Sequence, residues 1–248
     1  MPALESPVTR CLRFLLLALA LAGSAAHTAP FENSIAQRTL ACTACHGAQG
    51  RAGPDGYYPR LAGKPAGYLY NQLLNFRDGR RHYALMTQLV DPLSDAYLME
   101  IATYFSALDL PYPPPPPATA APDVLQRGQT LVQRGDAARR LPACVACHGA
   151  ALTGVAPHIP GLLGLPRDYL NAQLGAWRTG QRRAHAPDCM AHTVAQMRTE
   201  DIHAVTSWLA AQPLPGGASG NKPAAGLPAG QADRPACGSA PAPRSGPP

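Results

Sequence analysis

Two stretches of this sequence, Cys42-Thr43-Ala44-Cys45-His46-Gly47 and Cys144-Val145-Ala146-Cys147-His148-Gly149, carry the same pattern of two cysteines, a histidine and a glycine. Cysteines at positions i and i+3 of a helical turn lie on one side of it. They can form thioether bonds to both vinyl groups of one haem, and the histidine that follows then stands beneath the iron. The pattern CxxCH is therefore typical of c-type haem attachment. We expect two covalently bound haem c groups, attached by Cys42 and Cys45 and by Cys144 and Cys147, with His46 and His148 as iron ligands.

Two alternative interpretations of the cysteines are weaker. The four thiols could bind one zinc ion, but zinc modules usually place their cysteine pairs closer in sequence and rarely need a histidine after each pair. A thioredoxin-like redox CxxC is another alternative, but no βαβ pattern surrounds either motif.

The sequence that follows each motif is also duplicated. The segments Pro59-Arg60-Leu61-Ala62-Gly63 and Tyr68-Leu69-x-x-Gln72-Leu73 correspond to Pro160-Gly161-Leu162-Leu163-Gly164 and Tyr169-Leu170-x-x-Gln173-Leu174. Such a match, in the same order in both halves, indicates a duplicated domain.

The chain of 248 residues divides where its composition changes. We expect a first domain over residues 27–110, a Pro-rich linker over 111–122, a second domain over 123–212 and a tail over 213–248. Five consecutive prolines favour a stiff polyproline II spacer in the linker. The tail is rich in Pro, Gly and Ala without periodicity, which predicts disorder.

Residues 1–26 have the layout of a secretory signal peptide, with Arg10 and Arg13 before an apolar run from Phe14 to Gly23. The run is roughly half of the ~20 residues needed to cross a bilayer. We therefore expect an exported, soluble protein of the periplasm.

Apolar residues recur at helical spacing in both copies, and alternating strand patterns are absent, so the predicted fold class is all-α. The expected helices are 68–76 closed by Gly79, 169–177 closed by Gly180, one that begins after an N-cap at Ser94, one that begins after an N-cap at Thr199, and one that contains Leu125, Leu131 and Val132.

A methionine occupies a matching position in each copy, Met86 in the first and Met190 in the second. Methionine often fills cores, but equal placement in a divergent repeat favours a role as the sixth ligand of each iron. Three histidines are close enough in sequence to replace them as ligands: His82, His185 and His192.

The second methionine lies in the stretch HAPDCMAH, which follows a three-residue insertion relative to the first copy. Its neighbour Cys189 is interpreted as a buried or idle thiol. A disulfide with Cys237 in the tail is the alternative that an exported protein allows.

The order CxxCHG, P-x-L-x-G, Y-L-x-x-Q-L, R-x-G, Met and a final amphipathic helix resembles the class I cytochrome c domain. Two such domains in an exported chain resemble the dihaem cytochrome c4 family, over about residues 31–212. The resemblance implies two tandem class I domains, each wrapped around a haem. It also implies axial pairs of His46 with Met86 and of His148 with Met190.

The resemblance further implies that the carbonyl oxygens of Pro59 and Pro160 accept a hydrogen bond from the imidazole N–H of the haem-ligating histidine. Such a bond fixes the orientation of the ring and raises its basicity.

Two irons closed by His and Met can exchange electrons but have no position for a substrate. We therefore expect a periplasmic electron-transfer protein rather than an enzyme, with no catalytic residues, that shuttles electrons between a respiratory donor and a terminal oxidase or reductase. Its expected partners are membrane-bound redox proteins. The alternatives are a haem subunit of a dehydrogenase complex, or a dihaem peroxidase with one open iron near Met190.

The formal net charge of +6 arises from scattered Lys and Arg residues. An exported protein has no obvious nucleic acid to bind, and we expect neither nucleic acid nor a small-molecule substrate as a partner. Haem propionates are the expected counter-charges, with Arg60, Arg80 and Arg81 as candidates to pair with them.

Overall fold

A computed structural model of the chain describes residues 7–8, 32–53, 56–215, 223–225 and 237–243. Apart from residues 7 and 8, the predicted signal peptide lies outside the described residues. Within the described ranges no helix combines the length and the apolar character needed to cross a membrane.

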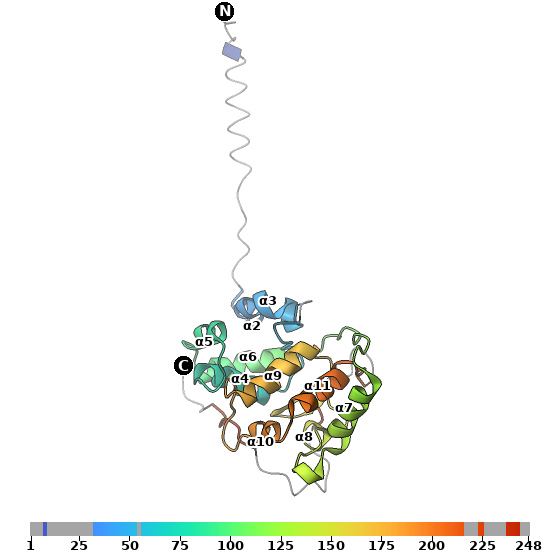
Figure 1. The fold of residues 1–248 in the computed structure, drawn as a ribbon. Coiled ribbons are helices and arrows are strands. Elements are labelled where there is room, and N and C mark those ends of the chain that lie inside the picture. Colours follow the sequence, from blue (N-terminus) through green and yellow to red (C-terminus); the bar gives the residue numbers. More distant parts are fainter. Residues whose placement is uncertain (1–6, 9–31, 54–55, 216–222, 226–236, 244–248) are drawn as a thin grey trace, which may run out of the picture.

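Helices make up nearly all of the regular secondary structure in the described residues, which confirms the predicted all-α class. The two repeats form two halves of one body (Figure 1). The helices of the first half are α2 (Ile35–Arg38), α3 (Leu40–His46), η1 (Ala48–Gly50), α4 (Ala66–Arg77), α5 (Ala84–Val90) and α6 (Asp95–Ala107). Those of the second half are α7 (Pro122–Arg134), η2 (Ala137–Arg139), α8 (Val145–His148), α9 (Arg167–Arg178), α10 (Cys189–Ala195) and α11 (Thr199–Ala210).

The second half also contains a short antiparallel pair of strands, β1 (Gly154–Val155) and β2 (Ile159–Pro160). In this pair Gly154 lies opposite Pro160 and Val155 opposite Ile159. Two-residue strands leave no alternating pattern in a sequence, so periodicity could not predict them.

The predicted helix ends are confirmed in part. The Ser94 hydroxyl accepts a hydrogen bond from the Tyr97 N–H at 3.3 Å and caps α6 as expected. The expectation for α11 is wrong by one residue, because Thr199 is its first residue and Arg198 is its N-cap. The Arg198 N–H donates to the carboxylate of Asp201 at 2.8 Å, so an acidic side chain in the first turn does the capping.

Each half has its own hydrophobic core. In the second half, α7 packs along α11, and Gly128 lies at their contact. A Cβ at Gly128 would stand 2.2 Å from the carbonyl oxygen of Ala204, so only glycine lets the two helices approach this closely.

The two halves dock through backbone hydrogen bonds between equivalent positions of the two copies. The N–H of His82 donates to the carbonyl of Gln181 at 2.8 Å, and the N–H of Arg183 donates to the carbonyl of Arg80 at 2.6 Å. These two bonds connect corresponding positions of the two copies in both directions, which indicates an approximate twofold relation between the halves.

Side chains extend the same relation. Arg81 donates to Gln72 of its own half at 3.1 Å and to Gln173 of the other half at 2.7 Å. Arg182 donates to Gln173 at 2.7 Å and to Gln72 at 2.9 Å. Each glutamine oxygen therefore accepts from both arginines, and the two halves share one polar network.

The linker packs against both halves. The guanidinium of Arg60 donates to the carbonyls of Leu110 and Pro111 and lies 3.7 Å from the ring centroid of Tyr112. Tyr112 itself is buried in the core of the second half. The segment is therefore docked at Leu110, Pro111 and Tyr112, rather than being only a spacer.

The expectation of a disordered tail is wrong for the described residues 223–225 and 237–243. Ala224 pairs with Val155, and Cys237 forms a disulfide with Cys189, with a Cα–Cα distance of 5.5 Å. The preferred interpretation of Cys189 as an idle thiol is therefore also wrong. A covalent anchor and main-chain hydrogen bonds order these segments, although they offer few apolar side chains.

Asp201 connects three elements of the second half and is fully buried. Its carboxylate accepts hydrogen bonds from Arg127 of α7 at 2.9 Å and from Arg139 of η2 at 2.6 Å. Burial alone would raise the pKa of this carboxyl, but the hydrogen bonds from Arg139, from the Arg198 N–H and from Arg127 outweigh it and hold the pKa below its ordinary value.

We predict that Asp201→Asn lowers the free energy of unfolding of the second half by about 2 kcal/mol at neutral pH, because it removes the buried partner of two arginines that still contact water. Since the folded state lowers the pKa, the ionised carboxylate stabilises the fold above the ordinary Asp range, and this contribution is lost as the pH falls through the lower, folded pKa. Denaturant unfolding followed by tryptophan fluorescence reports this half, because Trp177 and Trp208 both belong to it.

The matched control is Asp168→Asn, whose carboxylate pairs with Arg167 at an exposed position and is 86% accessible. This change is expected to cost less than about 1 kcal/mol. Equal losses for the two variants would contradict the structural role of Asp201.

Candidate haem sites

The two CxxCH motifs lie at the ends of short helices, α3 in the first half and α8 in the second. None of Cys42, Cys45, Cys144 and Cys147 is part of a disulfide, so all four can form thioether bonds. Before haem is attached, burial raises the pKa of Cys144 to about 12 and also raises the pKa of Cys42. The two cysteine pairs lie in different halves. Among the described residues no three His, Cys, Asp or Glu side chains are grouped to hold one metal ion, which disfavours the four-thiolate zinc alternative.

A glycine ends each of these helices in the left-handed region. The φ angle is +75° at Gly47 and +85° at Gly149. A Cβ at Gly47 would lie 2.4 Å from the carbonyl oxygen of Ala52, so the chain can reverse here only with glycine. A glycine directly after both motifs is the sequence signal for this reversal.

The reversal brings a proline carbonyl to each histidine. His46 Nδ1 lies 2.7 Å from the carbonyl oxygen of Pro59, and His148 Nδ1 lies 2.8 Å from that of Pro160. A carbonyl oxygen only accepts hydrogen bonds, so Nδ1 must carry the proton in both rings. Each Nε2 therefore keeps its lone pair, which is the atom a metal ion requires.

Both imidazoles are buried, at 6% exposure for His46 and 7% for His148. Burial lowers the pKa of His46, the hydrogen bond to Pro59 opposes this shift, and the charge of Arg81 adds to it. The pKa of His148 is also lowered by burial, against its bond to Pro160. Both rings are therefore neutral at neutral pH, the form that binds iron.

The two predicted methionine ligands lie in equivalent helices, Met86 in α5 and Met190 in α10. Both are partly buried, and each packs against the core of its own half. Among the competing histidines, His82 and His192 are exposed, and His185 lies 3.2 Å from a guanidinium nitrogen of Arg80. Methionine is thus the candidate ligand that each core holds in place.

Two of the arginines proposed to pair with haem propionates are engaged elsewhere. Arg60 donates to the backbone carbonyls of Ala62, Leu110 and Pro111. Arg80 donates to Asn75 at 2.7 Å and to Asp78 at 2.6 Å. In contrast, Lys64 is only 4% exposed, and its Nζ has no hydrogen-bond partner in the described part of the chain.

The residues present fit a covalently bound haem. Each half offers two cysteines on one helical turn, an imidazole with a free Nε2, and a thioether that packs against the core of the same half. A buried ammonium group such as that of Lys64 needs a counter-charge, which a haem carboxylate can supply. These features define a c-type cytochrome with one haem in each half.

Comparisons with known proteins agree with this class. The sequence pattern of the cytochrome c family matches residues 125–212. A thiosulfate dehydrogenase electron acceptor from Thiomonas intermedia (strain K12) is 42% identical over 201 residues, which are 80% of this chain and 91% of that protein. Cytochrome c4 from Pseudomonas aeruginosa is 33% identical over 197 residues, which are 79% of this chain and 94% of that protein.

Two solved structures are similar as well. The crystal structure of reduced recombinant cytochrome c4 from Pseudomonas stutzeri matches with a TM-score of 0.60 and 31% identity, covering 71% of this chain and 95% of that one. Thiosulfate dehydrogenase from Marichromatium purpuratum matches with a TM-score of 0.59 and 34% identity, covering 70% of this chain and 36% of that one. The chain belongs to the cytochrome c4 family and is a dihaem electron-transfer cytochrome with two covalently bound c-type haems.

We predict that Cys42→Ala/Cys45→Ala and Cys144→Ala/Cys147→Ala each retain one covalent haem per chain. Each double variant removes both thiols of one half and leaves the other half intact. The ratio of haem to protein, measured by pyridine haemochrome absorption and by mass spectrometry of the haem peptides, checks this outcome. Retention of two haems in either variant would contradict the assignment.

Proposed function

We propose that this chain is a periplasmic electron acceptor of a thiosulfate dehydrogenase and passes the electrons on to a terminal oxidase or reductase. The observation that carries this proposal is the order of the identities. The chain is 42% identical to a protein named as a thiosulfate dehydrogenase electron acceptor and 33% identical to a cytochrome c4, with nearly equal coverage of the two relatives. The likeness to part of a thiosulfate dehydrogenase structure supports the same donor.

The ligand set we propose is His46 with Met86 and His148 with Met190. A bound haem supplies a single iron that alternates between its ferric and ferrous states. The carbonyls of Pro59 and Pro160 hold each imidazole ring in one orientation, so the ring need not turn when the charge at its Nε2 changes. With Met86 and Met190 as the second ligands, the two irons would have no position left for a substrate, which supports a carrier rather than an enzyme.

The docked arrangement of the halves supports transfer between them. Arg81 and Arg182 are each bonded to glutamines of both halves, and the main chain adds bonds in both directions. Such an interface keeps the two haem sites at a fixed separation. We infer that an electron received in one half can reach the other without dissociation of the protein from its partner.

Reduction of the ferric protein by a thiosulfate dehydrogenase tests the proposed donor. With thiosulfate and catalytic amounts of the dehydrogenase, both haems are expected to become ferrous within the time of mixing and scanning. Controls omit the dehydrogenase or the thiosulfate. Failure of this reaction, together with rapid reduction by a quinol-oxidising respiratory complex, would overturn the proposed donor and favour a general respiratory carrier.

We predict that the wild-type ferrous protein does not bind carbon monoxide, because both irons have a sulfur ligand. In Met86→Ala and in Met190→Ala, half of the haem is expected to bind carbon monoxide, and the reduction potential of that haem is expected to fall. Absorption spectra with and without carbon monoxide, and a redox titration, check both outcomes. Carbon monoxide binding by the wild type would instead favour the peroxidase alternative.

A further inference from the structure

The two proposed methionine ligands are presented by loops of different length. Both loops start from equivalent points, because Arg81 and Arg182 face each other at the interface between the halves. The loop that leads to Met190 is three residues longer than the loop that leads to Met86. A longer loop has more conformations to lose on ordering, so the second loop needs additional contacts to hold its methionine equally well.

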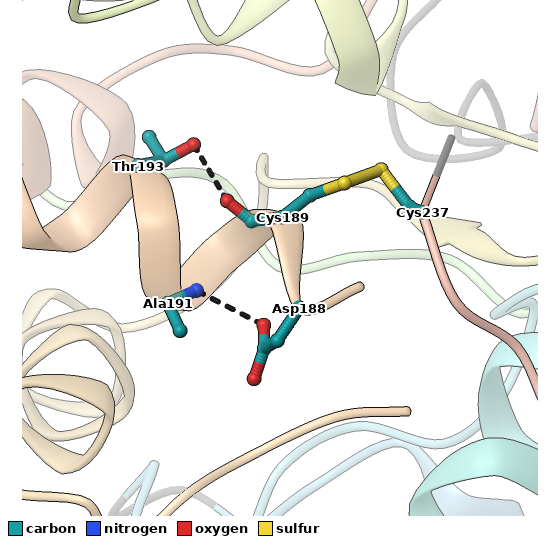
Figure 2. Close-up of a disulfide and its surroundings, with 5 residues drawn as sticks. All are labelled: Asp188, Cys189, Ala191, Thr193 and Cys237. Carbon is teal, nitrogen blue, oxygen red and sulfur yellow. Dashed lines mark hydrogen bonds between the residues drawn. A yellow bond between two sulfur atoms is a disulfide. The ribbon is translucent and has the colours of Figure 1, made fainter. Parts of the chain in front are cut away.

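Part of that support is local. The carboxylate of Asp188 accepts a hydrogen bond from the N–H of Ala184 at 2.7 Å. It also accepts one from the N–H of Ala191 at 2.9 Å, which is drawn in Figure 2. These bonds cap α10 and tie it to its own loop. However, α10 has only seven residues, and a helix of this length is marginal without external contacts.

The external contact comes from residues 237–240, which we call the strap. Figure 2 shows the disulfide between Cys237 and Cys189, the residue directly before Met190. The N–H of Gly238 donates to the carbonyl of Pro187 at 2.9 Å. A Cβ at Gly238 would lie 2.3 Å from the carbonyl oxygen of His185, so the strap lies directly on the main chain of the loop.

The other end of the strap is anchored in the first half. Ala240 is 8% exposed and belongs to the hydrophobic core of that half. Its N–H donates to the side-chain oxygen of Asn71 in α4 at 2.9 Å, and Asn71 is itself buried. The strap therefore links the loop of one half to the core of the other.

The first half has no equivalent device in the described residues. The position that corresponds to Cys189 is Leu85, which is 60% exposed. The N-cap of α5, Tyr83, makes no side-chain capping bond. The shorter loop reaches Met86 without a covalent anchor. The first haem therefore serves as an internal control when carbon monoxide binding at the second haem is measured.

We propose that the strap positions the sulfur ligand of the second haem by fixing Cys189 through its disulfide to Cys237. Consecutive Cα atoms are about 3.8 Å apart, so an anchor on Cys189 restricts local opening at Met190 directly. This inference rests on the ligand role of Met190 proposed above. Without the disulfide, α10 is expected to open locally and release the sulfur from the iron, while the first haem is unaffected.

The experiment measures carbon monoxide binding to the ferrous holoprotein, reduced with ascorbate so that the disulfide stays intact. In Cys237→Ser, carbon monoxide is expected to bind at one of the two haems under conditions in which the wild type binds none, because loss of the disulfide should raise the population of the open form by at least about tenfold. The double variant Cys189→Ser/Cys237→Ser excludes a freed Cys189 thiolate as a replacement ligand. Comparison with the spectra of Met86→Ala and Met190→Ala identifies the haem that opens.

Two further variants separate positioning from a general loss of structure. Leu85→Ser makes the matched change beside Met86 and is expected to leave both haems closed. Asn71→Ala keeps the disulfide but removes the acceptor of the Ala240 N–H. It is expected to open the second haem, by a smaller factor than Cys237→Ser, even though Asn71 lies in the first half. An effect of Asn71→Ala on the first haem alone, or on neither haem, would overturn the proposal.

Chemical reduction tests the same point without a mutation. A dithiol such as dithiothreitol transfers two electrons and two protons to the disulfide, which yields the thiols of Cys189 and Cys237 and the oxidised cyclic reagent. The second haem should then bind carbon monoxide. After the dithiothreitol is removed, an added disulfide such as oxidised glutathione accepts two electrons and two protons from the thiols of Cys189 and Cys237, and the re-formed bond should close the haem again. Thiol alkylation and mass spectrometry verify the state of both cysteines.

The outcomes distinguish this inference from the ligand assignment on which it rests. If the wild type already binds carbon monoxide at the second haem, the role of Met190 fails. If the wild type is closed and neither the cysteine variants nor dithiothreitol changes carbon monoxide binding, only the strap proposal fails. An equal change at both haems would also overturn it, because positioning predicts an effect on the second haem alone.

Discussion

The hydrogen bond from a buried imidazole to a proline carbonyl is the constraint on which each half of the molecule depends. It fixes the proton on Nδ1 and leaves Nε2 of His46 and His148 as the metal-binding atom. The bond forms because the chain reverses at Gly47 and Gly149, both of which have a positive φ angle that favours glycine. At Gly47 a Cβ would also collide with the carbonyl oxygen of Ala52. The glycine after the motif therefore contributes to the chemistry of the histidine before it, although it makes no bond to the ring.

Duplication explains why one network can hold the two halves together. Because the halves are related by an approximate twofold axis, the pair of Arg81 and Gln72 meets its own copy, Arg182 and Gln173, and every member makes contacts in both directions. The symmetry ends near Met190, where an insertion and the strap are added to one copy only. The two haem sites are thus alike on the histidine side and different on the methionine side.

Features that depend on short stretches could be predicted from the sequence, and features that depend on distant partners could not. The helical class, the cap at Ser94 and the matched positions of Met86 and Met190 in the repeat follow from local patterns, whereas the short helices α5 and α10 that carry the two methionines were not predicted. The predicted N-cap of α11 is wrong by one residue because threonine is a favoured N-cap residue type and arginine is not. The N-cap is nevertheless Arg198, since the carboxylate of Asp201 in the first turn accepts a hydrogen bond from its N–H.

Distant contacts leave no such local signal. The disulfide of Cys189 joins residues separated by 48 positions, and the composition of the tail around Cys237 indicates disorder rather than docking. The carbonyl partners of Arg60 could not be anticipated either, because any backbone carbonyl can accept and only the path of the linker decides which one does.

The net charge of +6 describes the surface of this protein poorly, because several of its cations are buried. Burial of a cation without hydrogen bonds is costly, and the structure meets this cost in different ways. Arg60 uses the linker carbonyls, and Arg182 uses glutamine oxygens and the hydroxyl of Tyr68. Lys64 has no such partner among the described residues, and a haem carboxylate fits this requirement. The Nζ of Lys64 also lies 5.9 Å from the ring centroid of Tyr112, the same ring that Arg60 contacts, so the docked linker helps to hold both cations.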